Sequence, residues 1–96
     1  MLFQKSRNKH QREIKMEHEL EEIIVAIEDM LEDNTIPKNV KRKIEETKQI
    51  LLKTETAISI RINQALNKLE ELSEETNINP FTRTQIWNIV SMLGAI

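Results

Sequence analysis

The chain has 96 residues, of which 31 % are charged and 39 % hydrophobic, with one glycine, two prolines and no cysteine. This length suits one small domain and leaves no room for a separate catalytic domain, while the lack of cysteine excludes disulfide bonds and thiolate chemistry. The formal net charge of −2 hides a segregation: residues 1–15 carry five lysines and arginines and one acid, whereas residues 17–33 carry eight acids and no lysine or arginine.

The first half of the chain predicts two helices. Residues 13–33 carry an apolar stripe at steps of three and four, formed by Met16, Leu20, Ile23, Ile24, Ile27, Met30 and Leu31. Pro37 suits the first turn of a second helix over residues 38–53. The inward face of that helix is marked by Val40, Ile44, Thr47 and Leu51.

The second half predicts two more helices. Residues 56–76 carry a third stripe, formed by Ile58, Ile62, Ala65, Leu66, Leu69 and Leu72, with Thr54 and Thr56 as candidate caps at its start. A break over residues 77–79 precedes a fourth helix over residues 80–93, which stops at Gly94 and carries Ile86, Ile89, Val90 and Leu93.

The two halves repeat each other. A shift of 42 residues brings Ile27 onto Leu69 and Ile44 onto Ile86. Short connections make sequential helices antiparallel neighbours. The sequence therefore predicts an all-α protein, an antiparallel four-helix bundle made of two related helical hairpins. Residues 13–96 form this domain, and residues 1–12 form a flexible basic N-terminal arm.

The repeat gathers acids at the ends of the first and third helices, where they oppose the helix macrodipole by roughly 0.3–1 kcal/mol each. These acids are Glu28, Asp29, Glu32, Asp33, Glu70, Glu71, Glu74 and Glu75. One interpretation is that basic residues at the starts of the facing helices screen them: Lys38, Lys41, Arg42, Lys43 and Arg83. The other is a docking pole for a basic partner or a cation. The spacing does not match a calcium-binding loop and the turn lacks its glycine, so no metal site is expected.

Enzyme chemistry is not expected. The chain has no cysteine or tyrosine, and its two histidines, His10 and His18, lie near the N-terminus. We therefore predict a protein without catalytic residues, cofactor or small-molecule substrate. It has no apolar stretch of about 20 residues and no signal-peptide pattern, which favours a cytoplasmic protein without a membrane partner.

Basic residues near the N-terminus are candidate nucleic-acid contacts: Lys5, Arg7, Lys9, Arg12 and Lys15. The opposing interpretation is a solvated tail that extends the first helix, and the acidic remainder, with an overall pI of about 5.7, argues against a nucleic-acid-binding surface.

Two residues of the fourth helix, Arg83 and Trp87, are candidate protein-docking residues. Trp87 either packs at the bundle edge or, where it is exposed beside Ile60 or Met92, marks a partner surface. We predict a non-enzymatic helical interaction or scaffolding protein that binds an unidentified protein or a second copy of itself. The alternative is a protein that binds RNA or the ribosome through the basic arm.

The C-terminal third resembles a known family. The run from Arg83 to Ser91, Arg-Thr-Gln-Ile-Trp-Asn-Ile-Val-Ser, and the first break at residues 36–40 are similar to uncharacterised protein family 0147, an archaeal family of small four-helix proteins. The likeness covers roughly residues 18–96 and departs from the family pattern at Asn79, Phe81 and Thr82. It implies an antiparallel helical bundle from a thermophilic archaeon and assigns no activity.

Overall fold

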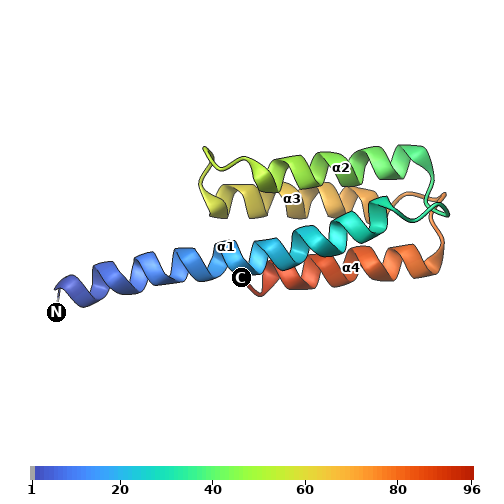
Figure 1. Cartoon of the computed structure of the whole chain (residues 1–96). Coiled ribbons are helices and arrows are strands. Elements are labelled where there is room, and N and C mark those ends of the chain that lie inside the picture. The colour runs from blue at the N-terminus through green and yellow to red at the C-terminus, as the bar shows by residue number, and fades with distance from the viewer. Residues whose placement is uncertain (1) are drawn as a thin grey trace.

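The computed structural model describes the backbone of residues 2–96 and the side chains of residues 11–96. Its four helices are α1 (Leu2–Leu31), α2 (Lys38–Leu52), α3 (Ile58–Ser73) and α4 (Pro80–Gly94), and the described backbone contains no strand. Each helix lies antiparallel to the next, and α4 returns to pack against α1 (Figure 1). The predicted all-α antiparallel bundle of two hairpins is confirmed.

The helix ends follow the sequence breaks, with differences of one to three residues at several of them. Asn79 is the N-cap of α4, and its side chain accepts a hydrogen bond from the Thr82 N–H at 2.7 Å, while Pro80 occupies the first turn. Pro37 is the N-cap of α2 rather than its first helical residue. The predicted threonine cap of α3 is wrong, because its N-cap is Ala57, which makes no side-chain hydrogen bond.

The largest difference from the prediction concerns α1, which has 30 residues and begins at Leu2, whereas α2, α3 and α4 have 15, 16 and 15. At about 1.5 Å per residue α1 is twice as long as its neighbours. Its N-terminal half extends past the other three helices, and the molecule measures 53 × 22 × 20 Å (Figure 1).

Residues 2–12 are therefore helical and continuous with the bundle part of α1, so the predicted boundary at residue 12 is not a break in secondary structure. The segment contains neither glycine nor proline, and six of its eleven residues are glutamine, lysine or arginine, all good helix formers. A flexible arm remains a prediction.

The core consists of the predicted stripes. Its buried hydrophobic residues are Leu20, Ile23, Ile27, Met30, Ile36, Val40, Ile44, Leu51, Ile62, Ala65, Leu69, Leu72, Ile78, Ile86, Ile89 and Leu93. Thr47 is also buried, and its hydroxyl donates to the Lys43 carbonyl at 2.9 Å, so this polar group stays hydrogen-bonded inside the bundle. In the part of the chain that the structure describes, none of the helices combines the length and hydropathy needed to cross a membrane.

Truncating a central core residue should destabilise the bundle strongly. We expect Ile27→Ala and Leu69→Ala each to lower the free energy of unfolding by about 2–5 kcal/mol, because each leaves a cavity among fully buried side chains. Chemical denaturation measures this loss. Val25→Ala, at a side chain 58 % exposed on the outside of α1, is the control and should change stability by less than about 0.5 kcal/mol.

Candidate functional site

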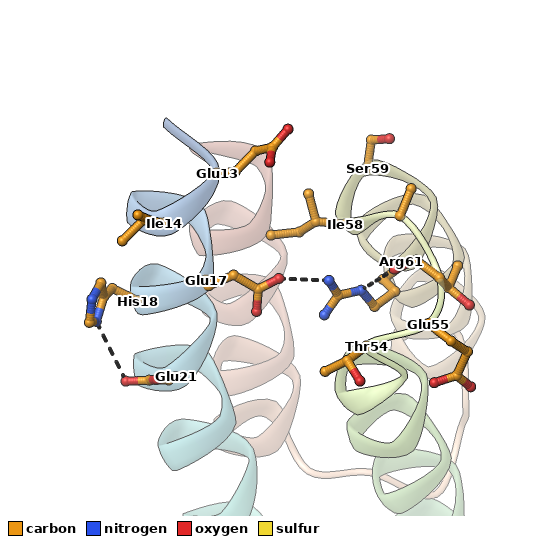
Figure 2. A pocket seen from close by; sticks show the side chains of 12 residues that line it. Glu13, Ile14, Glu17, His18, Glu21, Thr54, Glu55, Ile58, Ser59 and Arg61 are labelled. Atoms are coloured by element: carbon orange, nitrogen blue, oxygen red, sulfur yellow. Dashed lines mark hydrogen bonds and ion pairs between the residues drawn. The ribbon is translucent and has the colours of Figure 1, made fainter. Parts of the chain in front are cut away.

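A groove lies where α1 leaves the bundle. It has a volume of about 610 Å³ and lies between α1 and the connection from α2 to α3. Its α1 wall consists of Glu13, Ile14, Glu17, His18 and Glu21, and the other wall consists of Thr54, Glu55, Thr56, Ala57, Ile58, Ser59 and Arg61. Figure 2 shows Glu17 pointing across the groove toward Arg61, while Ile14 and His18 lie on the adjoining face of α1, at the edge of the groove.

Arg61 forms the floor of this groove. It is the fourth residue of α3 and is only 4 % exposed. Its Nη1 donates to the Leu51 carbonyl at 3.0 Å, its Nε to the Thr56 carbonyl at 2.8 Å and its Nη2 to Oε1 of Glu17 at 2.6 Å. A buried guanidinium is tolerated only when it is paired and hydrogen-bonded, and these three bonds satisfy that condition.

These bonds connect three parts of the chain. The Leu51 carbonyl belongs to the last turn of α2, where carbonyls lack helical partners, and the Thr56 carbonyl belongs to the α2–α3 connection. Arg61 thereby caps α2 and holds the connection against α1 through Glu17. The arrangement rigidly positions both walls of the groove.

Sequence reasoning missed Arg61 and Glu17. A signal was present, because Arg61 follows Ile58 by three residues and precedes Ala65 by four, at a step that the helical period assigns to the core. Glu17 carried no comparable signal, since a glutamate on an exposed helix face is ordinary. Their pairing joins residues 44 positions apart and depends on the packed bundle.

Removing the Arg61 guanidinium should lower the free energy of unfolding far more than removing the charge of Glu17. We expect Arg61→Met to lower the free energy of unfolding by about 2–4 kcal/mol, because two backbone carbonyls lose their donors. Glu17→Gln should cost less than about 1 kcal/mol, since the Glu17 side chain remains 47 % exposed. Denaturant titration of both variants compares the two, and equal losses would show that the ion pair, not the carbonyl capping, is the main contribution.

Arg83, a candidate docking residue, lies at the other end of the bundle. It is the fourth residue of α4 and donates to the carbonyls of Ser73 and Glu75 at 3.2 and 3.1 Å. Its position thus repeats that of Arg61, with the C-terminus of α3 in place of that of α2. These two hydrogen bonds engage part of its guanidinium within the chain, and a docking role stays a prediction.

Trp87, the other candidate docking residue, is 47 % exposed on α4. Met92 lies five residues further along the helix, about 140° around it, and lines a shallow hollow against α1 with Glu22 and Ile23. The structure thus brings Met92 to α1 rather than beside Trp87. The exposed tryptophan agrees with a partner surface, but its contact with a partner stays a prediction.

The acidic ends of α1 and α3 are partly screened from within the chain. Lys43 pairs with Glu75, as the screening interpretation expects, while Glu28 pairs with Lys48 at 3.7 Å, on the side of α2 rather than at its start. The connections at this end also touch, since the Asn77 side-chain amide donates to the Asn39 side-chain oxygen at 3.0 Å. These contacts support the screening interpretation of the acidic end.

Asp33 closes the turn after α1. Its carboxylate accepts hydrogen bonds from the hydroxyl and the backbone N–H of Thr35, at 2.6 and 2.9 Å. These bonds, the hydroxyl first, lower the pKa of Asp33, and Lys41 assists by its charge.

Loss of the Thr35 hydroxyl should raise the pKa of Asp33 toward its ordinary value. In Thr35→Ala the backbone bond remains, so NMR titration of the Asp33 carboxyl should show a partial upward shift. A lowered folded-state pKa contributes stability that is present above the unfolded pKa and is lost as pH falls through the folded one, so the stability difference between the two proteins should shrink on acidification. Thr84→Ala, which removes a hydroxyl bonded to the Pro80 carbonyl, should leave the titration of Asp33 unchanged.

The structure describes the side chains of two of the five basic candidate residues on α1. Arg12 is exposed, and Lys15 is exposed with a 4.0 Å contact to Glu19. Lys5, Arg7 and Lys9 lie outside the residues whose side chains the structure describes, although their backbone belongs to α1. The groove begins at Glu13, directly after Arg12, and Lys15 lies beside its first residues.

Metal binding has no structural support in the residues with described side chains. Among residues 11–96, no three histidine, aspartate or glutamate side chains are grouped so that they could hold an ion. His18 lies on the outer side of α1 with its Nδ1 3.7 Å from Glu21 (Figure 2).

The fold and the groove define a small antiparallel four-helix bundle with an elongated first helix, and comparisons with known proteins agree. Proteins of the same family from Archaeoglobus fulgidus and Methanocaldococcus jannaschii are 35 % and 34 % identical to this chain, each over 80 % of it and over 87 % and 83 % of their own lengths. The crystal structure of a protein of unknown function, MMP1188, is 36 % identical, with a TM-score of 0.78 over 81 % of this chain and 89 % of that one.

The chain belongs to the uncharacterised protein family UPF0147, whose model matches residues 6–96. The resemblance seen in the sequence is confirmed. The match begins at residue 6 rather than near residue 18, so most of the basic segment lies within the family region.

Proposed function

We propose that this protein is a non-enzymatic interaction module that binds a protein partner along the projecting half of α1 and in the groove at its foot. The length of α1 is the observation that best supports this proposal. A helix of 30 residues packs against neighbours half as long, and its N-terminal half extends beyond them (Figure 1).

The chemistry of the groove suits a partner that is both apolar and basic. Ile14, which is 46 % exposed, and Ile58 provide apolar surface, while Glu13, Glu17 and Glu55 provide carboxylates. A helix with an apolar face and flanking lysines or arginines matches this combination.

Binding of RNA or the ribosome is the weaker alternative. The five bases in residues 1–15 favour it, because they would neutralise phosphates. However, Glu13, Glu17, Glu21 and Glu55 follow immediately along the same surface and would repel a phosphate backbone. A protein partner avoids this conflict.

A non-enzymatic role is part of the proposal. The groove is open, its carboxylates lie on exposed helix surface, and its arginine is engaged with backbone carbonyls. Neither cysteine nor tyrosine is present in the chain, and a serine–histidine pair is one of the nucleophile and base combinations that could remain. Ser59 and His18 lie on different walls, with His18 turned to the outside of α1 (Figure 2).

Site-specific photocrosslinking tests the proposal. A photoreactive residue at position 14, in the groove, should give adducts in archaeal cell extract that protease destroys and nuclease leaves intact. The same residue at position 81 is the control, because Phe81 is even more exposed but lies at the opposite end of the molecule.

Absence of a position-14 adduct, or equal labelling from both positions, would contradict the proposed surface. An adduct that nuclease destroys would instead support the nucleic-acid alternative. Repeating the reaction at high salt adds a second criterion, since phosphate contacts weaken steeply with ionic strength and apolar contacts do not.

A further inference from the structure

Every fourth residue of α1 from position 5 to position 21 is charged, and the sign changes once along the series: Lys5, Lys9, Glu13, Glu17 and Glu21. Residues four apart on a helix form one continuous ridge. All five positions lie within α1, so its ridge is basic in the projecting half and acidic where it borders the groove.

We propose that the partner in this groove is a second copy of the chain, with the two α1 helices packed antiparallel. The ridge is complementary to itself at four of its five positions in this arrangement, while the two Glu13 residues fall opposite one another at its centre. Lys5 of one copy lies level with Glu21 of the other, and Lys9 lies level with Glu17, because both pairs are centred on residue 13. A two-fold axis beside Glu13 then repeats every contact, as expected of a closed dimer. This inference rests on the proposed function, since it names the partner of the same surface.

The acidic half of the ridge is accessible to such a partner. The side chain of Glu21 is 77 % exposed. Glu17 is bonded to Arg61 through Oε1 yet keeps nearly half of its surface, so it can accept a second cation. Glu55, on the other wall of the groove, adds a further carboxylate beside the path of the incoming helix.

Helix packing geometry permits this contact. Two ridges made of residues four apart interdigitate when the helix axes cross at about 50°. The crossing point lies beside Glu13, next to the exposed Ile14, which would provide apolar contact near the two-fold axis. On either side of that point, the basic half of each α1 passes over the groove of the other copy.

Lys5 and Glu21 are too far apart to pair within one chain. Lys5 and Glu21 lie on one continuous helix, and 16 helical residues separate them by about 24 Å. Their attraction is realised only between two molecules.

Sedimentation velocity over a range of protein concentrations tests the proposal. At low salt the full-length protein should reach twice the chain mass of 11.3 kDa, and high salt should weaken the association. Lys5→Glu and Glu21→Lys should each remain at 11.3 kDa, because each places like charges opposite one another.

An equimolar mixture of Lys5→Glu and Glu21→Lys should restore the dimer, because every level pair except that of the two Glu13 residues is then of opposite charge. The matched controls Lys38→Glu and Glu32→Lys make the same charge changes at exposed positions away from the ridge and should dimerise like the unmodified chain. Circular dichroism checks that every variant is folded.

Several results would overturn the proposal: an unmodified protein that stays at 11.3 kDa at every concentration, ridge variants that dimerise as well as their controls, or a mixture of the two variants that stays monomeric. The experiments distinguish a wrong dimer proposal from a wrong interaction proposal. A monomeric protein that still gives a nuclease-resistant adduct at position 14 has a different protein partner, whereas a monomer with no such adduct lacks the proposed interaction surface altogether.

Discussion

The buried guanidinium of Arg61 is the interaction on which the arrangement of this molecule most depends. It lies where the last turn of α2, the α2–α3 connection and α1 meet, and it contributes one hydrogen bond to each. A charge at 4 % exposure is favourable only with all its partners in place. A single side chain therefore joins α1, α2 and the α2–α3 connection at the end of the bundle from which α1 projects.

The opposite end uses a related arrangement with a different outcome. Arg83 has the same place in α4 that Arg61 has in α3, and it too donates to carbonyls at the end of the preceding helix. Acids crowd that end, where Lys43 and Lys48 pair with two of them. The groove at the Arg61 end differs, because its carboxylates adjoin the basic stretch of the same helix, α1. This asymmetry favours the groove end as the binding end.

The features that could be predicted from the sequence are those that the burial of apolar side chains determines. The stripes through Ile27 and Leu69 identified the helices, their pairing and the core, because a packed helix must alternate apolar and polar faces. The start of α1 escaped prediction for the same reason: a helix without a packed face leaves no apolar period, and residues 2–12 show none. The groove escaped because its walls are far apart in sequence, and the threonine cap expected for α3 is absent because Ala57 occupies the N-cap position.

The projecting half of α1 is better suited to binding than a free peptide of the same sequence would be. An isolated helix of about 12–15 residues is marginal in water, chiefly because its first turn is costly to nucleate. Here the bundle half of α1, buried through Leu20, Ile23 and Ile27, supplies that nucleus, and the chain only propagates it outward. A partner then meets a helix that is already formed, so association loses less conformational entropy than coupled folding and binding would. In the proposed interaction, the charged half of α1 would thereby act as a recognition surface without requiring a core of its own.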